Sequence, residues 1–249
     1  MDRPKLLDLF SGAGGAARGY QMAGFHVTGI DIKPQPRYAG DVFIQGDALE
    51  YLSAHGHEYD VIHASPPCQA YSAMRCLPWL KDKEYWDSIP PTRSALEKIE
   101  KTWVIENVER APMQNGITLC GTMFGLKVYR HRRFESNVLL FQPQHIKHRE
   151  VIGAGHMFND RRGTNENGWV SQPSKAHWKP VEQRQRKSSY EAGGMVTITG
   201  DVGTYCGPAM GVDWMNGNEL SQAIPPAYCK FVGEQLMRVI TSYDRSRVA

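Results

Sequence analysis

Short apolar runs that each end in a turn or a carboxylate constrain the fold of this chain more than any other feature. The strand-like runs cover residues 5–10, 26–31, 42–47, 59–64 and 102–105, and helical spacing lies between several of them. Strands that alternate with helices form parallel sheets, because each crossover helix carries the chain back over one face. The pattern therefore predicts an α/β fold with a doubly wound, largely parallel sheet.

A glycine-rich turn follows the first run. Residues 11–17 read Ser-Gly-Ala-Gly-Gly-Ala-Ala, and helical spacing continues to Ala23. The spacing Gly12-x-Gly14-x-x-Ala17 provides a tight turn, a backbone that a ligand can approach closely and a helix N-terminus with free N–H groups. Glycine turns between a strand and a helix are also common without a ligand, so the motif alone indicates a nucleotide site only weakly.

Two carboxylates end the next two runs. Asp31 closes the second run and Asp47 the third, about where the ribose-binding acid of nucleotide-binding folds lies. Either acid could instead cap the helix that follows it, and this alternative is serious for Asp47. The glycine turn, Asp31 and Asp47 nevertheless follow three successive predicted strands at the same position, and this regularity favours a ligand-binding site at the carboxyl ends of these strands.

A proline turn follows the fourth run. Residues 65–69 read Ser-Pro-Pro-Cys-Gln, and two prolines cannot continue a strand because they lack the N–H of the ladder. They hold Cys68 on a stiff corner at the carboxyl end of the strand, where open α/β sheets bind ligands. Cys68 is therefore a candidate nucleophile, and the alternative is a half-buried cysteine beside an ordinary turn. Glu106 ends the fifth run and should reach the same edge.

The remaining elements are less regular. Residues 71–91 read as a long aromatic and proline-containing loop, and residues 92–101 have helical spacing. Residues 116–124 and 134–140 indicate two further strands. A helix should begin at the prolines 225–226, and its apolar face is expected to pack in the core.

The positive charge of the chain is concentrated after residue 126. Residues 127–149 contain six lysines and arginines but a single acid, Glu135. Residues 150–206 combine further arginines with Trp169, Trp178 and Tyr190. Such a mixture suits phosphate contact and base stacking, although a solvated basic face is the commoner outcome. His145 and His148 resemble half a metal site, but no cysteine or second pair completes it at the usual spacing, and we predict no metal.

The composition narrows the class of protein. A composition of 41% hydrophobic and 22% charged residues is typical of an ordinary globular protein. The net charge of +3 is only a weak indication of a nucleic-acid partner. The five cysteines form no Cys-x-x-Cys pair, which argues against a disulfide scaffold and for a reducing compartment. We see no secretory leader and no apolar run that could cross a bilayer, so we expect a cytoplasmic protein without a membrane partner.

Three motifs occur in order at the ends of predicted strands. They are Asp-Leu-Phe-Ser-Gly-Ala-Gly-Gly at 8–15, Pro-Cys-Gln-Ala-Tyr-Ser at 67–72 and Glu-Asn-Val at 106–108. Together they resemble the signature motifs of the DNA cytosine-5 methyltransferases, over residues 5–134 and weakly again near residue 210. The resemblance implies a Rossmann-like methyltransferase fold, S-adenosyl-L-methionine as cofactor and double-stranded DNA as substrate.

The resemblance also implies catalytic roles. Cys68 would add to C6 of a flipped-out cytosine, which makes C5 enamine-like, and its pKa should need lowering because only the thiolate attacks. Glu106 would hold or donate a proton at N3, which works best if burial raises its pKa. The family's Gln-x-Arg-x-Arg motif aligns with Val128-x-Arg130-x-Arg132. Both arginines would reach the active site, one of them at the cytosine O2.

By the same resemblance, the S-adenosylmethionine site would contain Phe10, Gly12, Gly14, Asp31, Ile32, Asp47, Ala48 and Pro67. Asp31 replaces the family's usual ribose-binding glutamate, and Ile32 replaces a common aromatic residue that stacks on adenine. Asp47 would meet the adenine amino group. The family's C-terminal Gly-Asn-x-Val motif appears only as Ser-Gln-Ala-Ile at 221–224.

The resemblance divides the chain into three parts. Residues 1–136 would form the catalytic and cofactor-binding domain, residues 137–206 a small irregular inserted target-recognition region, and residues 207–249 a segment and helix that return to the catalytic domain. A recognition region this short predicts a short or relaxed target sequence. The enzyme could protect a genome against restriction or mark it for regulation.

Three alternatives stay open at this point. A branch of the same family methylates cytosine in tRNA, although its own signature after Glu-Asn-Val is not seen here. A non-catalytic module that recruits a partner to DNA would not need all four of the catalytic candidates. A Rossmann dehydrogenase is disfavoured by the proline–cysteine turn.

Overall fold

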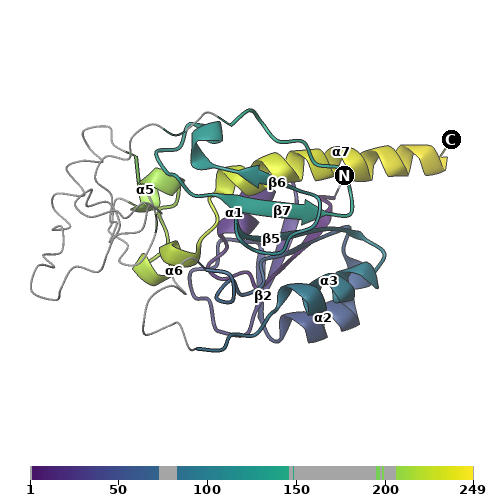
Figure 1. Ribbon diagram of the computed structural model, residues 1–249. Helices are drawn as coiled ribbons and strands as arrows, with labels where there is room; N and C mark the ends of the chain where they lie inside the picture. Colours follow the sequence, from purple (N-terminus) through teal and green to yellow (C-terminus); the bar gives the residue numbers. More distant parts are fainter. Residues whose placement is uncertain are drawn as a thin grey trace, which may run out of the picture.

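The computed structural model describes residues 2–72, 83–145, 148, 195–196, 198 and 206–248 (Figure 1). Its strands are β1 (Lys5–Leu9), β2 (His26–Asp31), β3 (Val42–Gln45), β4 (Val61–Ala64), β5 (Thr102–Val108), β6 (Gly116–Leu119) and β7 (Arg132–Ser136). They form a seven-stranded sheet in the order β3-β2-β1-β4-β5-β7-β6. β1 to β5 pair in parallel, whereas β7 runs antiparallel to both β5 and β6. The predicted doubly wound, largely parallel sheet is confirmed.

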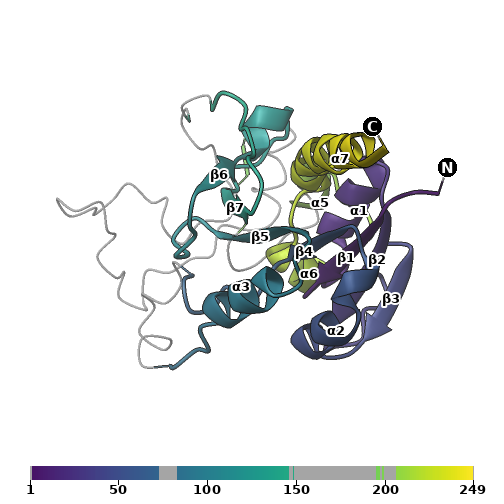
Figure 2. The same ribbon diagram turned by 90° about the vertical axis from the view of Figure 1, so that its right-hand side faces the viewer.

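The helices of the described residues are α1 (Gly15–Met22), α2 (Ala48–His55), α3 (Ile89–Glu97), α5 (Cys206–Met210), α6 (Gly217–Gln222) and α7 (Pro226–Val248), with 3-10 turns η1 (Gly56–Glu58) and η3 (Gly121–Phe124). Helices α1 and α7 cover one face of the sheet, and α2 and α3 cover the other (Figure 2). The side chains of β1 alternate between two cores, as a strand buried on both faces requires. Leu6 packs with Tyr20 of α1 and Tyr228 of α7, whereas Leu7 packs with Leu96 of α3 on the opposite face.

The C-terminal helix confirms its prediction. α7 lies along α1, and its side chains at 228, 232 and 236 are fully buried in the core that these helices share with β1 and β2. The approach is close, since a Cβ atom at Gly19 of α1 would collide with the carbonyl oxygen of Pro226. The segment beyond residue 206 therefore returns to the sheet domain.

Some boundaries differ from the predictions. α3 begins at Ile89, because Pro90 and Pro91 occupy its first turn, where a proline costs no helical hydrogen bond. β6 ends at Leu119 and is followed by η3, so only the first part of the strand predicted at residues 116–124 is a strand in the structure. α5 and α6 were not predicted. Most of the predicted recognition region, 137–206, and part of the loop 71–91 lie outside the described residues. Among the residues that are described, no helix is long and apolar enough to span a membrane.

Candidate active site

The carboxyl ends of the parallel strands meet at one edge of the sheet. Leu9 of β1 pairs with Ile30 of β2 and with Ala64 of β4, and Ala64 pairs with Ile105 of β5, so the residues that follow these positions share this edge. These are Phe10 after β1, Asp31 at the end of β2, Ser65 after β4 and Glu106 within β5. The structure thus brings Glu106 to the edge that carries the proline–cysteine turn, as the sequence predicts.

The turn that carries Cys68 is fixed by side chains from two other segments. Asn107 donates a hydrogen bond of 2.8 Å from Nδ2 to the carbonyl of Pro66, and Ser88 Oγ donates one of 3.0 Å to the carbonyl of Pro67. A proline cannot offer an N–H for the ladder, so its carbonyl is the group left to anchor. These bonds hold the Cys68 backbone rigidly. The part played by Ser88 was missed in the sequence.

The Cys68 thiol is half-buried at this edge. Burial raises its pKa, the positive charge of Arg132 opposes this rise, and the negative charge of Glu106 adds to it. The net effect is a pKa above the ordinary value for a thiol. The surroundings in the unliganded protein therefore do not provide the lowering of the pKa that attack by the thiolate needs, because desolvation outweighs the nearby arginines.

The Glu106 carboxyl is only 4% exposed, and burial raises its pKa, against the opposing charge of Arg132. Arg132 Nε lies 2.9 Å from Glu106 Oε1. That contact is not aligned as a hydrogen bond, and Oε1 accepts none from the described residues. A buried acceptor without a donor is costly, so this oxygen is the atom of the site most in need of a ligand.

A buried hydrogen-bond chain leads to the same carboxyl. The Tyr20 hydroxyl lies 2.9 Å from His63 Nδ1, and His63 Nε2 lies 2.8 Å from Ser65 Oγ, which in turn bonds Glu106. Burial lowers the pKa of His63 to about 3, so the imidazole is neutral and has one donor and one acceptor nitrogen. Sequence reasoning missed His63, although an imidazole inside a buried apolar run was the available signal.

The two candidate arginines have different hydrogen-bond partners. Arg132 contacts Glu106, whereas the buried Arg130 donates to the carbonyls of Ala223 (2.9 Å), Ser221 (2.7 Å) and Ile198 (3.4 Å). The charges of both arginines nevertheless act on Cys68 and Glu106. Backbone carbonyls at the end of a helix need donors, and a guanidinium provides several.

The glycine turn after β1 has open space at Gly12, whereas Gly14 and Gly15 lie against other backbone segments. Phe10 has a φ of +59°, a strained value for a bulky residue, and Gly12 has a φ of +50°. A side chain at Gly12 would meet no atom within 4 Å. Asp31 Oδ2 accepts a hydrogen bond of 3.0 Å from Gly12 N and so ties the turn to the end of β2. Ser11 Oγ is buried without a hydrogen-bond partner among the described residues.

The C-terminal segment closes over this turn. Trp214 Nε1 donates a hydrogen bond of 2.9 Å to the carbonyl of Ala13, 201 residues away in the sequence. The backbone of Ile224 lies so close to Gly15 that a Cβ atom there would collide with it. Residues 221–224 thus support the glycine turn despite their departure from the family motif. Trp214 gave no signal in the sequence.

The other predicted cofactor residues lie along the same edge. The Ile32 side chain is 67% exposed beside Asp31, so it offers an apolar surface at the end of β2. Asp47 caps α2, because its Oδ1 accepts from the N–H groups of Leu49 (2.9 Å) and Glu50 (3.0 Å). The alternative that the sequence left open for Asp47 is thus present in the structure. Ala48 is buried in the core below the helix.

The chain is similar in sequence to bacterial methyltransferases, although no protein-family model matches it. It is 30% identical over 156 residues to the type II methyltransferase M.XorII of Xanthomonas oryzae pv. oryzae, in an alignment that covers 56% of this chain and 32% of that protein. It is 29% identical over 121 residues to M.AquIA of Picosynechococcus sp., covering 42% and 48%. The alignments thus take in about a third to a half of these relatives.

Solved structures with the same fold match almost the whole chain. A proposed DNA modification methyltransferase encoded within an E. coli prophage superposes with a TM-score of 0.60 at 16% identity, over 96% of this chain and 99% of that one. The Dnmt2 methyltransferase of S. pombe superposes with a TM-score of 0.53 at 13% identity, over the same shares. This protein therefore has the same fold as these two methyltransferase structures, and about half of its sequence is similar to type II methyltransferases.

Proposed function

We propose that this protein transfers a methyl group from S-adenosyl-L-methionine to C5 of a flipped-out cytosine in double-stranded DNA. The observation that carries the proposal is the constellation of Cys68, Glu106 and Arg132 at one edge of the sheet. A thiol on a turn that Asn107 holds lies at the same edge as a buried carboxyl, whose charge acts on the thiol. Oε1 of this carboxyl accepts no hydrogen bond from the described residues, and a guanidinium lies 2.9 Å from it. The type II methyltransferase relatives favour DNA as the substrate.

The residues around the glycine turn fit S-adenosyl-L-methionine. Gly12 faces open space, Ser11 Oγ lacks a partner, and no side chain caps the N-terminus of α1, so its N–H groups can bind a carboxylate. Asp31 would accept hydrogen bonds from the ribose hydroxyls, and the exposed Ile32 would cover the adenine. When bound, the cofactor supplies an electrophilic methyl group, which C5 of the cytosine accepts.

The side chains of the chain prepare the cytosine for this transfer. The Cys68 thiolate adds to C6, the C5–C6 double bond opens, and N3 takes the proton that the raised pKa of Glu106 keeps on its carboxyl. Arg132 stabilises the negative charge that Glu106 then acquires. After methylation a base removes the C5 proton, the double bond reforms, the thiolate leaves C6, and N3 returns its proton to Glu106.

The target base must leave the duplex to reach Cys68. Flipping costs a few kcal/mol, which phosphate contacts elsewhere on the protein must offset. Most of the basic residues predicted for that role lie between 146 and 205, outside the described residues. We therefore keep residues 137–206 as the proposed recognition region, with a short or relaxed target sequence.

The test is bisulfite sequencing of plasmid DNA from cells that express the full chain, beside a Cys68→Ser variant. Lys98→Ala, an exposed change behind α3, is the matched control. We expect cytosines that resist conversion in the wild type and in Lys98→Ala and that convert in Cys68→Ser. Their shared flanking bases would give the target sequence.

Complete conversion of the DNA in all three strains contradicts the proposal. Bisulfite sequencing of tRNA from the same cells then shows whether the substrate is RNA instead. Titration calorimetry with S-adenosyl-L-methionine separates the remaining possibility, since a binding module that is not a methyltransferase would give no heat.

A further inference from the structure

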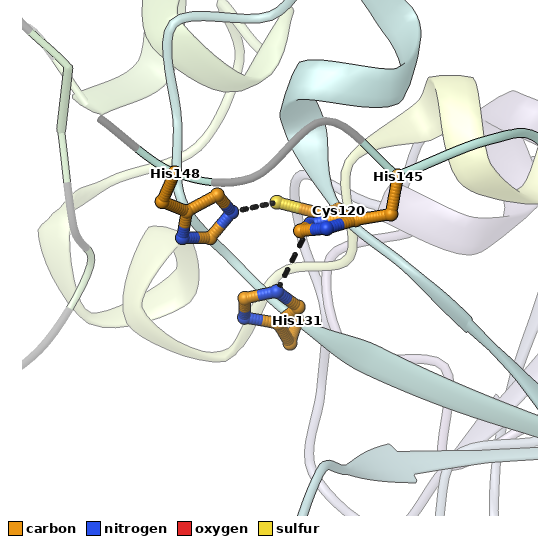
Figure 3. Close-up of side chains that lie close together, drawn as sticks. All are labelled: Cys120, His131, His145 and His148. Carbon is orange, nitrogen blue, oxygen red and sulfur yellow. Dashed lines mark hydrogen bonds between the residues drawn. The ribbon is translucent and has the colours of Figure 1, made fainter.

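Four side chains of the types that bind metals lie close together (Figure 3), and none of them belongs to the candidate active site described above. They are Cys120 between β6 and η3, His131 just before β7, and His145 and His148 in the segment after β7. One potential ligand atom of each lies within 4.8 Å of those of all the others. Cys120 is buried and the three histidines are half-buried. The cluster therefore has the residue types and the shielding of a metal site.

The sheet itself brings two of these residues together. Leu119, at the end of β6, pairs with Arg132, at the start of β7, in antiparallel register. The next position on each chain is Cys120 and His131. The sequence pattern showed only His145 and His148, and the reasoning from spacing found no cysteine to complete them. Spacing along the sequence does not reveal Cys120, because residues far apart in sequence meet here through strand pairing.

The distances suit tetrahedral coordination. A tetrahedral zinc ion with Zn–N of about 2.0 Å and Zn–S of about 2.3 Å holds its ligand atoms roughly 3.3–3.6 Å apart. In the cluster, Cys120 Sγ lies 3.3 Å from His148 Nε2, and His131 Nε2 lies 3.4 Å from His145 Nε2. The two pairs already have the required separation. The widest distance, 4.8 Å, needs to close by about 1 Å through side-chain rotation.

Neighbouring groups contact these side chains. Glu109 Oε2 lies 4.0 Å from His131 Nδ1, beyond hydrogen-bond distance. Metal-binding histidines typically direct their second nitrogen at a carboxylate, and Glu109 is the carboxylate that lies near His131 Nδ1. The Tyr129 ring stacks on His148 at 3.9 Å between centroids, and Thr122 Oγ1 lies 3.6 Å from Cys120 Sγ.

We propose that Cys120, His131, His145 and His148 bind a structural zinc ion. One thiolate with three imidazoles favours zinc over magnesium or calcium, which prefer oxygen ligands. Four protein ligands fill a tetrahedral shell and leave no position for a substrate, so the ion would hold structure and not react. It would fasten the segment after β7, which leads into the predicted recognition region, to β6 and β7. His131 sits directly between Arg130 and Arg132, so the ion would also fix this strand beside the active site.

The same four side chains could instead form a thiolate paired with protonated imidazole, without any metal. The two arrangements are distinguished by metal content. The full chain, purified without chelator, should contain about one zinc ion per molecule by inductively coupled plasma mass spectrometry. We expect His145→Ala and His148→Ala to lose most of it. His57→Ala, at an exposed histidine outside the cluster, and Cys68→Ser should retain it.

Cobalt(II) provides a second readout. After removal of the native metal from the wild type, added cobalt should give the visible bands of a tetrahedral ion and a thiolate charge-transfer band, and Cys120→Ser should lose the latter. This measurement decides the case even if the variants fold poorly, because it uses the wild-type chain. A folded wild type that contains no zinc and gives no tetrahedral cobalt spectrum overturns the proposal. Neither readout depends on methyl transfer, so zinc binding and the proposed function can fail separately.

Discussion

Two cysteines of this chain occupy opposite kinds of surroundings. Cys68 stands at the edge where parallel strands end, on a turn whose carbonyls are tied down, with a carboxyl and a guanidinium nearby. Cys120 stands where two antiparallel strands end, among three imidazoles. Burial raises the pKa of both thiols, but at Cys120 hydrogen bonds from His131 and Thr122 outweigh burial and lower the pKa to about 5.

The difference teaches that the partners of a thiol, and not its burial, decide what it can do. The surroundings of Cys68 leave the thiol half-buried and raise its pKa, which favours the protonated form. The partners of Cys120 are themselves ligands and surround the sulfur. The predictions below exchange or remove these partners, and they are ordered by the size of the expected effect.

The largest effect should come from exchanging the two cysteines for serine. Cys68→Ser should lower methyl transfer on the order of 10³-fold or more, because a nucleophile is lost. Cys120→Ser should lower zinc content and still form the covalent adduct. Trapping on DNA that contains 5-fluorocytosine, read on a denaturing gel, measures adduct formation directly. A trapped adduct in Cys68→Ser would contradict the role of Cys68 as the nucleophile. The absence of an adduct in a folded Cys120→Ser would contradict the separate, structural role of Cys120.

Glu106 provides the next contrast within the first site. Glu106→Gln keeps the shape of the side chain but removes the proton that N3 receives, so kcat/KM should fall by about 10²–10⁴-fold. Glu135→Gln is a matched control, since Glu135 is also buried on the sheet but pairs with Arg93 at 2.6 Å and not with Arg132. If both variants lose activity equally, the role given to Glu106 is wrong.

The two arginines should separate stability from catalysis. Arg130→Ala leaves several carbonyls without donors and should lower the free energy of unfolding by about 3 kcal/mol. Arg132→Ala should change stability less and lower kcat more. Urea denaturation beside steady-state kinetics measures both. If the two variants lose the same free energy of unfolding, the hydrogen bonds of Arg130 to the carbonyls do not stabilise the fold more than the contacts of Arg132.

The smallest effect concerns the charge around Cys68. Arg132 lowers a pKa that burial raises, so Arg132→Ala should raise the pKa of Cys68 further. A higher pKa leaves less thiolate below it, and alkylation by iodoacetamide near neutral pH should slow by about tenfold for each unit of the rise. Peptide mapping assigns the label to Cys68. Faster alkylation in Arg132→Ala would show that the Arg132 side chain blocks access of the reagent to the thiol more than its charge favours the thiolate.

The parallel half of the fold could be predicted because it depends on local patterns. Strands buried on both faces read as apolar runs, and a register that places their ends together brings Phe10, Asp31, Cys68 and Glu106 to one edge. The start of α3 was misplaced, since Pro90 and Pro91 are equally compatible with a loop and with the first helical turn.

The parts that sequence could not predict depend on contacts between distant segments. Cys120 meets His131 only through the pairing of β6 with β7, and Arg130 finds its acceptors about ninety residues further along the chain. Trp214 reaches Ala13 across the whole domain. A local pattern carries no information about such partners, because any exposed tryptophan or arginine would read the same way.

The closure of the glycine turn by the last segment has a consequence for synthesis. Chains emerge from the ribosome from their N-terminus, and contacts between remote residues form late. The turn at residues 11–15 is made well before Trp214, Ile224 and α7, which support it. The nascent protein thus carries this turn unsupported until those residues have been synthesised.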